Sequence, residues 1–408
     1  MRTRKLVGSA LVGALVLALG LGLGAVAAPK DRWVTAWGSS MQGPGPATMT
    51  VSDATVQMIA RSTLAGSAVR LRLENTFGAE PLTVGEAYVG LRNSEVGLVE
   101  GSNRRVTFGG QPSVTIPAGG RVWSDAVTVE VEAQQDLAVS LYLPGTNVPI
   151  TRHNSALTTS YLTPNGAGNH AAGEDRSAFT LTTTSMLWLS AVDVLAAPGA
   201  SAIAFFGDSI TDGSCSTLEA HDRWEDLVAV RLALGRGKGK SVVNEGIGGN
   251  TVTREGLVPP PSSLPGIERL DRDVLELSGV SNVVLFMGTN DIRREASAAQ
   301  VIAGYEEIIR RVKAAGLRII GVTIIPRHNR PPEGDNTGWN DAKTAIRNQV
   351  NEWIRTSGQF DAVLDFDKVV RDPADPDLIN PIYNCDGIHP NPFGYFNMGK
   401  SVDLDAFK

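Results

Sequence analysis

The chain has 408 residues, of which 42% are hydrophobic and 20% charged, a balance typical of soluble globular proteins that excludes disordered or collagen-like organisation. This length exceeds what a single hydrophobic core usually serves, so two domains are expected. The net charge is −6 and no long cluster of Lys and Arg occurs, which argues against nucleic-acid binding.

The first residues are typical of a secretory signal peptide, because three basic residues precede an apolar stretch from residue 6 to 26. Small residues at the end of this stretch predict cleavage after Ala27. Removal of residues 1–27 would leave 34 basic and 43 acidic residues, a net charge of −9. An uncleaved membrane anchor is the alternative, but five glycines within the stretch weaken a spanning helix. We therefore expect a secreted protein with no stable membrane insertion after cleavage.

Residues 28–197 are expected to form a β-rich accessory domain. Short runs such as Val69–Leu73 and Val127–Val131 alternate apolar and polar side chains, which places the apolar ones on one face of a strand. Clusters of Gly, Pro and Asn separate these runs, and no convincing amphipathic helix occurs among them. The pattern predicts an antiparallel β-sandwich or jelly roll.

A linker is predicted at Leu195–Ala200, and residues 198–408 then alternate between strand-like and helix-like segments. The apolar runs that suit buried parallel strands are residues 202–206, 241–244, 280–287, 317–325 and 362–366. The helix-like stretches are residues 224–234, 267–277, 298–315, 339–356 and 393–407. This alternation predicts a doubly wound α/β domain, in which ligands bind beyond the carboxyl ends of the strands.

Polar motifs follow the first three predicted strands, and a fourth motif lies near the C-terminus. They are Gly207-Asp208-Ser209-Ile210, Asn244 to Asn250, Gly288-Thr289-Asn290-Asp291 and Asp386-Gly387-Ile388-His389-Pro390. In this order they resemble the four sequence blocks of the SGNH (GDSL) hydrolases over roughly residues 201 to 408. The resemblance implies a flavodoxin-like three-layer hydrolase domain, and secreted bacterial members with a β-rich domain ahead of it look similar over most of the chain.

The residues themselves favour nucleophilic catalysis. A serine hydroxyl needs an adjacent base, and His389 is the only histidine with an acidic residue, Asp386, three positions before it. Asp386 could hold the imidazole in the tautomer that accepts the proton of Ser209. The resemblance assigns the oxyanion hole to the backbone N–H groups of Ser209 and Gly249 and to the side-chain amide of Asn290.

The other histidines do not indicate a metal site. His153, His170, His221 and His328 lack metal-ligand spacing, so we expect neither a metal nor an organic cofactor. His153 or His170 could line the catalytic cleft if the first domain leans over it.

A disulfide is predicted between Cys215 and Cys385. They are the only two cysteines, and the signal peptide would send them to an oxidising compartment. Cys215 lies six residues after Ser209, and Cys385 directly precedes Asp386. If Ser209 and His389 meet for catalysis, the loops that carry the two cysteines must also be neighbours. Two buried free thiols are the alternative.

The sequence therefore predicts a secreted serine esterase that hydrolyses carboxylic esters through an acyl-enzyme. The substrates implied by the resemblance are small-molecule, lipid or polysaccharide acyl esters, with a carbohydrate (acetyl) or short-chain acyl esterase as the leading interpretation. A lipase or lysophospholipase is the first alternative. The second belongs to another class, a secreted glycan-binding protein with an auxiliary hydrolase domain. The sequence does not indicate an oligomeric state.

Overall fold

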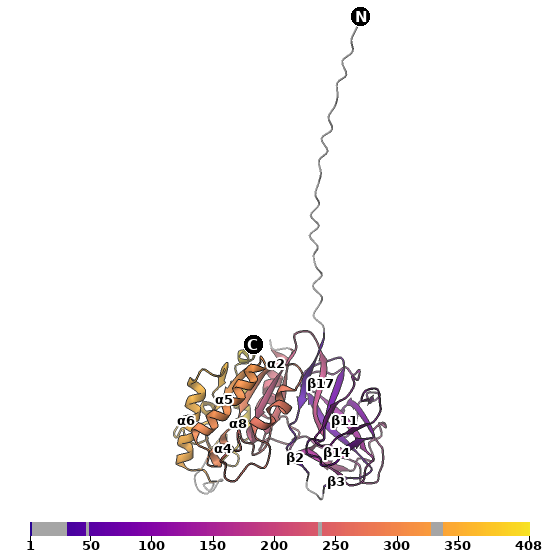
Figure 1. The fold of residues 1–408 in the computed structure, drawn as a ribbon, viewed down its shortest axis with the longest axis horizontal. Helices are drawn as coiled ribbons and strands as arrows, with labels where there is room; N and C mark the ends of the chain where they lie inside the picture. Colours follow the sequence, from indigo (N-terminus) through magenta and orange to yellow (C-terminus); the bar gives the residue numbers. More distant parts are fainter. Residues whose placement is uncertain (2–30, 46–48, 236–238, 328–337) are drawn as a thin grey trace.

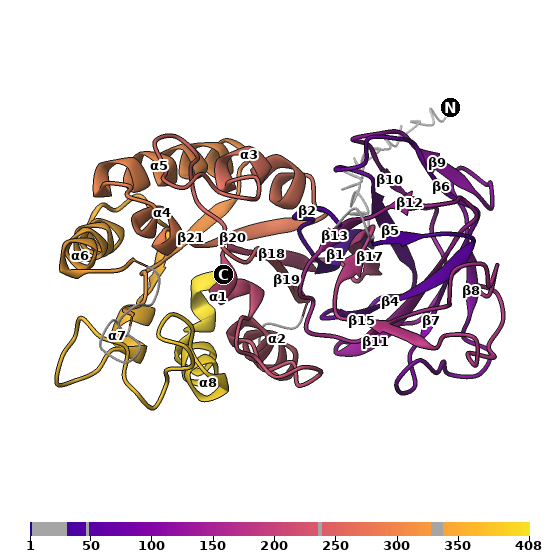
Figure 2. The same ribbon diagram turned by 90° about the horizontal axis from the view of Figure 1, so that it is seen from below.

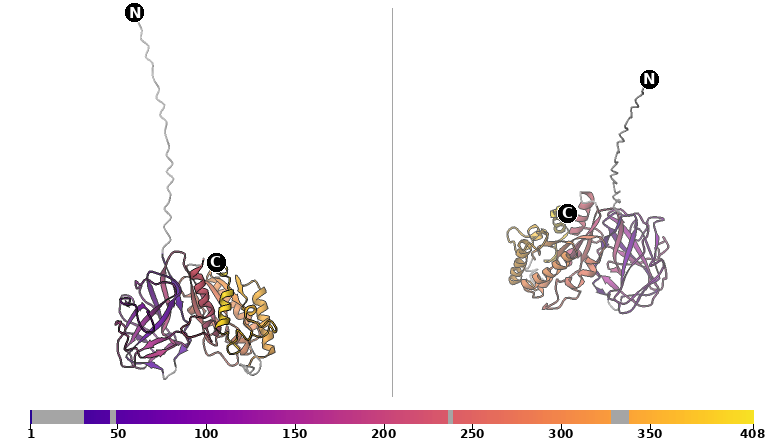
Figure 3. Two further views of the ribbon diagram at one scale, coloured as in Figure 1. Left: turned by 180° about the vertical axis from the view of Figure 1, so that it is seen from behind. Right: turned by 45° about the horizontal axis from the view of Figure 1, so that its top comes forward.

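The chain forms two lobes that lie side by side, one rich in β-structure and one α/β (Figures 1 and 3). The computed structural model describes every residue except 2–30, 46–48, 236–238 and 328–337. The predicted signal peptide and His328 therefore lie outside the described residues. Within the part that is described, no helix is both long and apolar enough to cross a membrane.

Two antiparallel sheets make up most of the β-rich lobe. The four-stranded sheet has the order β1 (Arg32–Gly38), β17 (Leu189–Ala196), β5 (Val69–Glu74), β10 (Arg121–Trp123). The six-stranded sheet has the order β15 (Leu181–Thr183), β14 (Ser160–Leu162), β4 (Ala54–Ser62), β11 (Gln135–Leu143), β7 (Glu86–Leu91), β8 (Arg104–Val106). Short pairings complete the lobe, among β2 (Gly43–Pro44), β3 (Thr50–Val51), β6 (Leu82–Val84), β9 (Val114–Ile116), β12 (Val148–Pro149), β13 (Thr151–His153) and β16 (Met186–Leu187).

Side chains from both sheets form one core. Leu71 of β5 and Val192 of β17 belong to the same buried cluster as Val56 of β4 and Val139 of β11. Alternate residues of a strand point to the same face, so the period-two pattern of the sequence becomes the apolar inner face of each sheet. The predicted antiparallel β-rich region is confirmed, and its finer description as a jelly roll stays a prediction.

Two expectations for this lobe are wrong in detail. Val127–Val131 is not a strand, because it makes only isolated bridges from Val127 to Val69 and from Val131 to Gly66. The alternation of this segment buries Val127, Val129 and Val131 without a continuous ladder. The predicted linker is shorter than expected, since β17 continues to Ala196 and leaves only residues 197–200 before the next strand.

The second lobe is built on a five-stranded parallel sheet. Its order is β19 (Lys240–Gly246), β18 (Ser201–Gly207), β20 (Val280–Phe286), β21 (Arg318–Val322), β22 (Ala362–Leu364). In chain order this is 2-1-3-4-5, the flavodoxin-like arrangement, and it confirms the predicted doubly wound α/β fold. All seven residues of β18 are buried, which explains why the strand reads as a continuous apolar run.

Helices cover both faces of the parallel sheet (Figure 2). They are α1 (Ser209–Asp212), α2 (Trp224–Leu234), α3 (Gly266–Leu270), α4 (Thr289–Arg293), α5 (Ala298–Ala314), α6 (Asp341–Thr356), α7 (Phe366–Val370) and α8 (Pro392–Ser401). The expected helix at 267–277 is instead α3 followed by the π-helix η1 (Asp271–Leu275). The expected helix at 393–407 ends at Ser401, and the chain then forms the 3₁₀ helix η3 (Leu404–Phe407).

The β-rich lobe lies against β19, the edge strand of the parallel sheet. Ala202 of β18 and Val243 of β19 belong to the core of the β-rich lobe. The backbone N–H of Val242 donates to Thr63 Oγ1 at 2.9 Å, and Ser241 Oγ donates to the carbonyl of Thr35 at 2.6 Å. Apolar burial and hydrogen bonds therefore join the two lobes along one strand.

Candidate active site

Ser209 is the first residue of α1 and lies just beyond the carboxyl end of β18, an interior strand of the parallel sheet. Gly207 ends β18, and the carboxylate of Asp208 caps the helix by accepting the N–H of Ile210 at 3.0 Å. A Cβ on Gly207 would lie 2.1 Å from Thr211 Oγ1, so only glycine allows this tight passage from strand to helix. The Ser209 side chain is thus held at the strand end that ligands reach in this fold.

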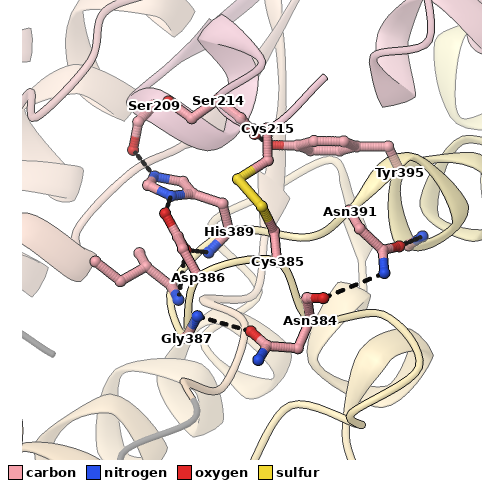
Figure 4. Close-up of a disulfide and its surroundings, with 12 residues drawn as sticks. Ser209, Ser214, Cys215, Asn384, Cys385, Asp386, Gly387, His389, Asn391 and Tyr395 are labelled. Atoms are coloured by element: carbon pink, nitrogen blue, oxygen red, sulfur yellow. Dashed lines mark hydrogen bonds and ion pairs between the residues drawn. A yellow bond between two sulfur atoms is a disulfide. The ribbon is translucent and has the colours of Figure 1, made fainter. Parts of the chain in front are cut away.

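Asp386 and His389 reach Ser209 from a loop before α8 (Figure 4). Ser209 Oγ lies 2.8 Å from His389 Nε2, and His389 Nδ1 lies 2.8 Å from Asp386 Oδ2. The other carboxylate oxygen of Asp386 accepts the backbone N–H groups of Ile388 and His389 at 3.0 and 2.9 Å. The structure therefore brings together the three side chains that the sequence singled out.

The acceptor role of Asp386 sets its charge. Partial burial raises the pKa of this carboxyl, but the hydrogen bonds from the His389 side chain and from two backbone N–H groups outweigh it and hold the pKa well below its usual range. Asp386 is therefore an anion that can orient the imidazole of His389 and stabilise its protonated form.

A disulfide joins the two loops that carry these residues, as predicted. Cys215 and Cys385 are bonded, with their Cα atoms 6.5 Å apart (Figure 4). Tyr395 of α8 adds a second link, because its hydroxyl donates to the carbonyl of Ser214 at 2.7 Å. The loop after the serine helix and the loop of the histidine are thus fixed to one another.

Gly249 lies in the loop after β19, beside the loops after β18 and β20. Its φ of +73° is in the left-handed region that favours glycine. Among the hydrogen bonds of the described residues, neither the N–H of Gly249 nor that of Ser209 has a protein acceptor. Such free N–H groups at neighbouring strand ends suit an anionic oxygen.

Asn290 lies on α4, directly after β20, and its side chain is buried. Its amide nitrogen donates to the carbonyl of Asn250 at 3.0 Å. A primary amide carries two N–H groups, so one remains for a ligand. The side chain therefore lies against the loop that carries Gly249, as expected of a residue acting with it.

The sequence motifs contained a further pair of acids to which no role was assigned. Asp291 accepts the backbone N–H groups of Val252 and Thr253 at 2.9 to 3.1 Å, which ties α4 to the loop of Gly249. Burial raises the pKa of Asp291 to about 7, with the charge of Asp208 adding to the shift, and burial raises the pKa of Asp208 itself to about 6. Asp291 thus supports the loop of Gly249, and Asp208 caps the helix that begins at Ser209.

The structure describes three of the other histidines, His153, His170 and His221. His153 is buried and its Nε2 lies 3.0 Å from Asp212 Oδ1, so the first lobe does reach the neighbourhood of the site. The imidazole of His170 bonds only to the nearby carbonyl of Ala167, and His221 lies between the lobes. A pairing between residues 153 and 212 has no sequence signature, because the two belong to different lobes.

One group of described residues brings three possible metal ligands within 4.8 Å of one another, namely Cys215, Asp386 and His389. Cys215 Sγ is bonded to Cys385, so it offers no thiolate. Both ring nitrogens of His389 are engaged by Ser209 and Asp386. The group does not suit a metal ion and suits proton transfer instead.

Comparison with known proteins gives a family match over the second lobe. Residues 205–395 match the GDSL-like Lipase/Acylhydrolase family. No curated protein matches the chain.

Similar solved structures share about half of the chain. An inhibitor-bound aryl esterase from M. smegmatis has 18% identity and a TM-score of 0.41, covering 51% of this chain and 100% of that one. A member of the lipolytic protein G-D-S-L family from Veillonella parvula has 20% identity and a TM-score of 0.37, covering 50% and 96%. A carbohydrate acetylesterase family member from Sinorhizobium meliloti has 18% identity and a TM-score of 0.38, covering 49% and 94%.

Proposed function

Residues 205–395 belong to the GDSL-like lipase/acylhydrolase family of carboxylic ester hydrolases, and from this premise we propose that the chain hydrolyses acyl esters through an acyl-serine intermediate. Ser209 is the nucleophile, His389 the general base and Asp386 the residue that orients the base. The observation that carries this proposal is the unbroken hydrogen-bonded series from Ser209 Oγ through His389 to Asp386, with both steps at 2.8 Å.

The first half-reaction forms the acyl-enzyme. His389 Nε2 takes the hydroxyl proton as Ser209 Oγ bonds to the ester carbonyl carbon, whose oxygen becomes an oxyanion. The N–H groups of Ser209 and Gly249 and the free amide N–H of Asn290 stabilise that charge. The C–O bond to the alcohol then breaks, and His389 returns the proton to the departing alkoxide.

The second half-reaction releases the acid. A water molecule gives a proton to His389 Nε2 and attacks the acyl carbon, which again produces an oxyanion in the same donor set. The bond to Ser209 Oγ breaks, and the serine recovers its proton from His389. Asp386 stays ionised throughout and stabilises the imidazolium at both stages.

The decisive experiment replaces Ser209 with Ala. Ester hydrolysis should disappear while the melting temperature changes little, and a serine-directed organophosphonate should label only the wild type. Ser214→Ala is the matched control, because Ser214 lies just after the helix that begins at Ser209 and only its backbone is hydrogen-bonded to other residues. Turnover retained by purified Ser209→Ala would overturn the mechanism.

For the substrate, we propose an ester of a polar alcohol with a short acyl group, such as an acetylated carbohydrate. The side of the site that faces the β-rich lobe is polar and supports this choice. Gln42 Nε2 lies 3.9 Å from where a Cβ of Gly248 would be, and Gln42 Oε1 accepts the N–H of the exposed Asn154 at 2.6 Å. These groups suit hydroxyl-bearing alcohols.

A lipase or lysophospholipase is the second candidate, and a specific feature favours it. Ile382, Phe393 and Phe396 are exposed, and they lie on the segment that also carries His389. Asn391 ties this segment together by donating to the carbonyl of Ile382 at 2.9 Å. Exposed apolar side chains beside a catalytic loop are typical of contact with long acyl chains.

A panel of p-nitrophenyl esters from acetate to palmitate, measured beside acetylated xylan, separates these candidates. Preference for acetate and release of acetate from xylan would support the carbohydrate esterase, whereas preference for palmitate would support the lipase. Binding of xylan by Ser209→Ala without turnover in the wild type would favour the glycan-binding alternative.

We also propose that the protein is exported. The disulfide supports this, because such bonds persist mainly in oxidising compartments. N-terminal sequencing of protein recovered from the culture medium should begin at Ala28, and retention of residues 1–27 on membranes would contradict the proposal.

A further inference from the structure

Ser40 belongs to the β-rich lobe and lies at its contact with the α/β lobe. It follows β1 and is almost fully buried. Its carbonyl lies 2.9 Å from His153 Nδ1, and its hydroxyl accepts a hydrogen bond from Arg269 Nη1 at 2.9 Å. Two paths therefore lead from this one residue into the α/β lobe.

The first path runs through His153, which must be protonated to satisfy its neighbours. The Nδ1 atom faces the Ser40 carbonyl, while Nε2 faces Asp212 Oδ1 at 3.0 Å and the Ser155 carbonyl at 3.3 Å. All three partners are acceptors, and a neutral imidazole has only one N–H. The side chain is therefore an imidazolium, and it forms a buried ion pair with Asp212 across the interface between the lobes.

Asp212 carries this contact to the proposed oxyanion hole. It lies on α1, three residues after Ser209, and its Oδ2 accepts the N–H of Gly248 at 2.8 Å. A Cβ on Gly246 would lie 2.2 Å from Asp212 N, so the end of β19 packs directly on α1. One carboxylate thus connects the β-rich lobe, the serine helix and the residue before Gly249.

The second path runs through Arg269, a fully buried side chain on α3. Its Nε donates to Asn250 Oδ1 at 3.0 Å and its Nη2 donates to the carbonyl of Gly207 at 2.9 Å. Asp273 balances its charge at 3.0 Å. The loop Gly246–Asn250 is therefore held at Gly248 by the first path and at Asn250 by the second, on either side of Gly249.

We infer that the β-rich lobe is a positioning component of the esterase site, in which Ser40 and His153 act through Asp212 to hold the Gly249 N–H toward the oxyanion. This inference rests on the proposed function and goes beyond it, because it gives the first lobe a part in catalysis. The oxyanion develops only after substrate has bound, so a misplaced donor lowers kcat and leaves KM nearly unchanged.

The test is the kinetics of His153→Gln. Losing a whole oxyanion donor costs roughly 10²–10³-fold in kcat, so displacing one should cost about 10-fold, with KM within about twofold of the wild type. His170→Gln is the matched control, since His170 belongs to the same lobe but its imidazole contacts only the carbonyl of Ala167, at 3.0 Å, and it should keep full activity.

A double-mutant cycle with Asp212→Asn identifies the path. Asp212→Asn should lower kcat by a similar factor, and the double variant should be no worse than Asp212→Asn alone, because both changes break the same connection. If His153→Gln does not fold, the kcat of Asp212→Asn alone still tests the inference, since this change preserves the shape of the side chain and removes the ion pair.

The outcomes separate the inference from the proposed function. A lower melting temperature with unchanged kcat in His153→Gln and Asp212→Asn would reduce the contact to lobe packing and overturn the inference. A rise in KM at constant kcat would overturn it as well. Activity in Ser209→Ala would instead overturn the proposed function, and the positioning role would fall with it.

Discussion

The two lobes contribute to the candidate site in different ways, and only one of these ways is visible in sequence. In the α/β lobe, the side chains with a proposed catalytic role lie in short motifs at strand ends, as with Ser209 after β18 and Asn290 after β20. In the β-rich lobe, Ser40 and His153 lie in no motif, 113 residues apart, and meet only in the folded chain. Reactive groups thus leave local patterns, whereas the groups that hold them in place need not.

Replacing Asp386 with Asn tests the motifs of the α/β lobe, and the largest loss of activity is expected there. An amide at this position would donate to His389 Nδ1 and favour the tautomer whose Nε2 cannot accept the serine proton. We expect kcat to fall by roughly 10⁴-fold with the fold preserved. Steady-state kinetics check this, with Asp405→Asn as the exposed control. A loss below tenfold would mean that Asp386 does not orient the base.

Opening the disulfide tests how the α/β lobe keeps its own loops together. The bond spans 170 residues, and the chain-entropy treatment gives a stabilisation of up to about 5 kcal/mol. Cys215→Ser with Cys385→Ser should therefore lower the melting temperature strongly and reduce activity, because the loops of Ser209 and His389 separate. Calorimetry with parallel assays checks this, and unchanged stability in the double variant would contradict it.

Asn290→Ala sharpens the comparison at the proposed oxyanion hole. Loss of one donor should lower kcat by roughly 10²–10³-fold with little change in KM. Asn397→Ala is the control, because Asn397 is half-buried and its side chain donates only to the carbonyl of Phe393 on its own helix. A higher KM at constant kcat would show that Asn290 binds substrate rather than the oxyanion.

The pH dependence of the melting temperature tests the contribution of His153 in the β-rich lobe, and this is the smallest of the expected effects. Burial and Arg223 lower the pKa of His153, but Asp212 and the Ser40 carbonyl outweigh them and raise it above its usual value. The titratable or charged residues lining the cavity of about 60 Å³ beside it are Arg61, Asp212, His221, Arg223, Glu225 and Asp226.

A raised pKa in the folded state means that His153 stabilises the protein fully below its unfolded pKa and loses this contribution as pH rises through the folded pKa. The melting-temperature difference between wild type and His153→Gln should therefore be largest near about pH 6 and shrink toward about pH 9. A difference that stays constant over this range would contradict the ion pair.

Much of the α/β lobe was predictable because buried parallel strands produce continuous apolar runs. The run at residues 202–206 lies within β18, and α2 has the predicted bounds. The errors fall where local pattern and tertiary structure diverge. The helix expected at 267–277 changes to a π-helix at Asp271, and the helix expected to reach 407 stops at Ser401.

The candidate site was likewise predictable only where its residues lie in local sequence patterns. Asp386 and His389 are three residues apart, so one turn presents both, and the disulfide followed from the two loops having to meet. The partners of the loop Gly246–Asn250 were not predictable, since Arg269 looks like an ordinary charge on a predicted helix and Asp212 lies outside every motif. Their contacts depend on Ser40, which follows β1, and on His153 of β13.

The contact of Thr63 with Val242 has a consequence for the solubility of the second lobe. Because β19 is the last strand of its sheet, its outer N–H and C=O groups could pair with another chain. The hydroxyl of Thr63 occupies that edge at Val242, and Val243 is buried beneath the first lobe. A fragment beginning at residue 198 would expose an open, apolar strand, so the α/β lobe should aggregate when it is expressed without its neighbour.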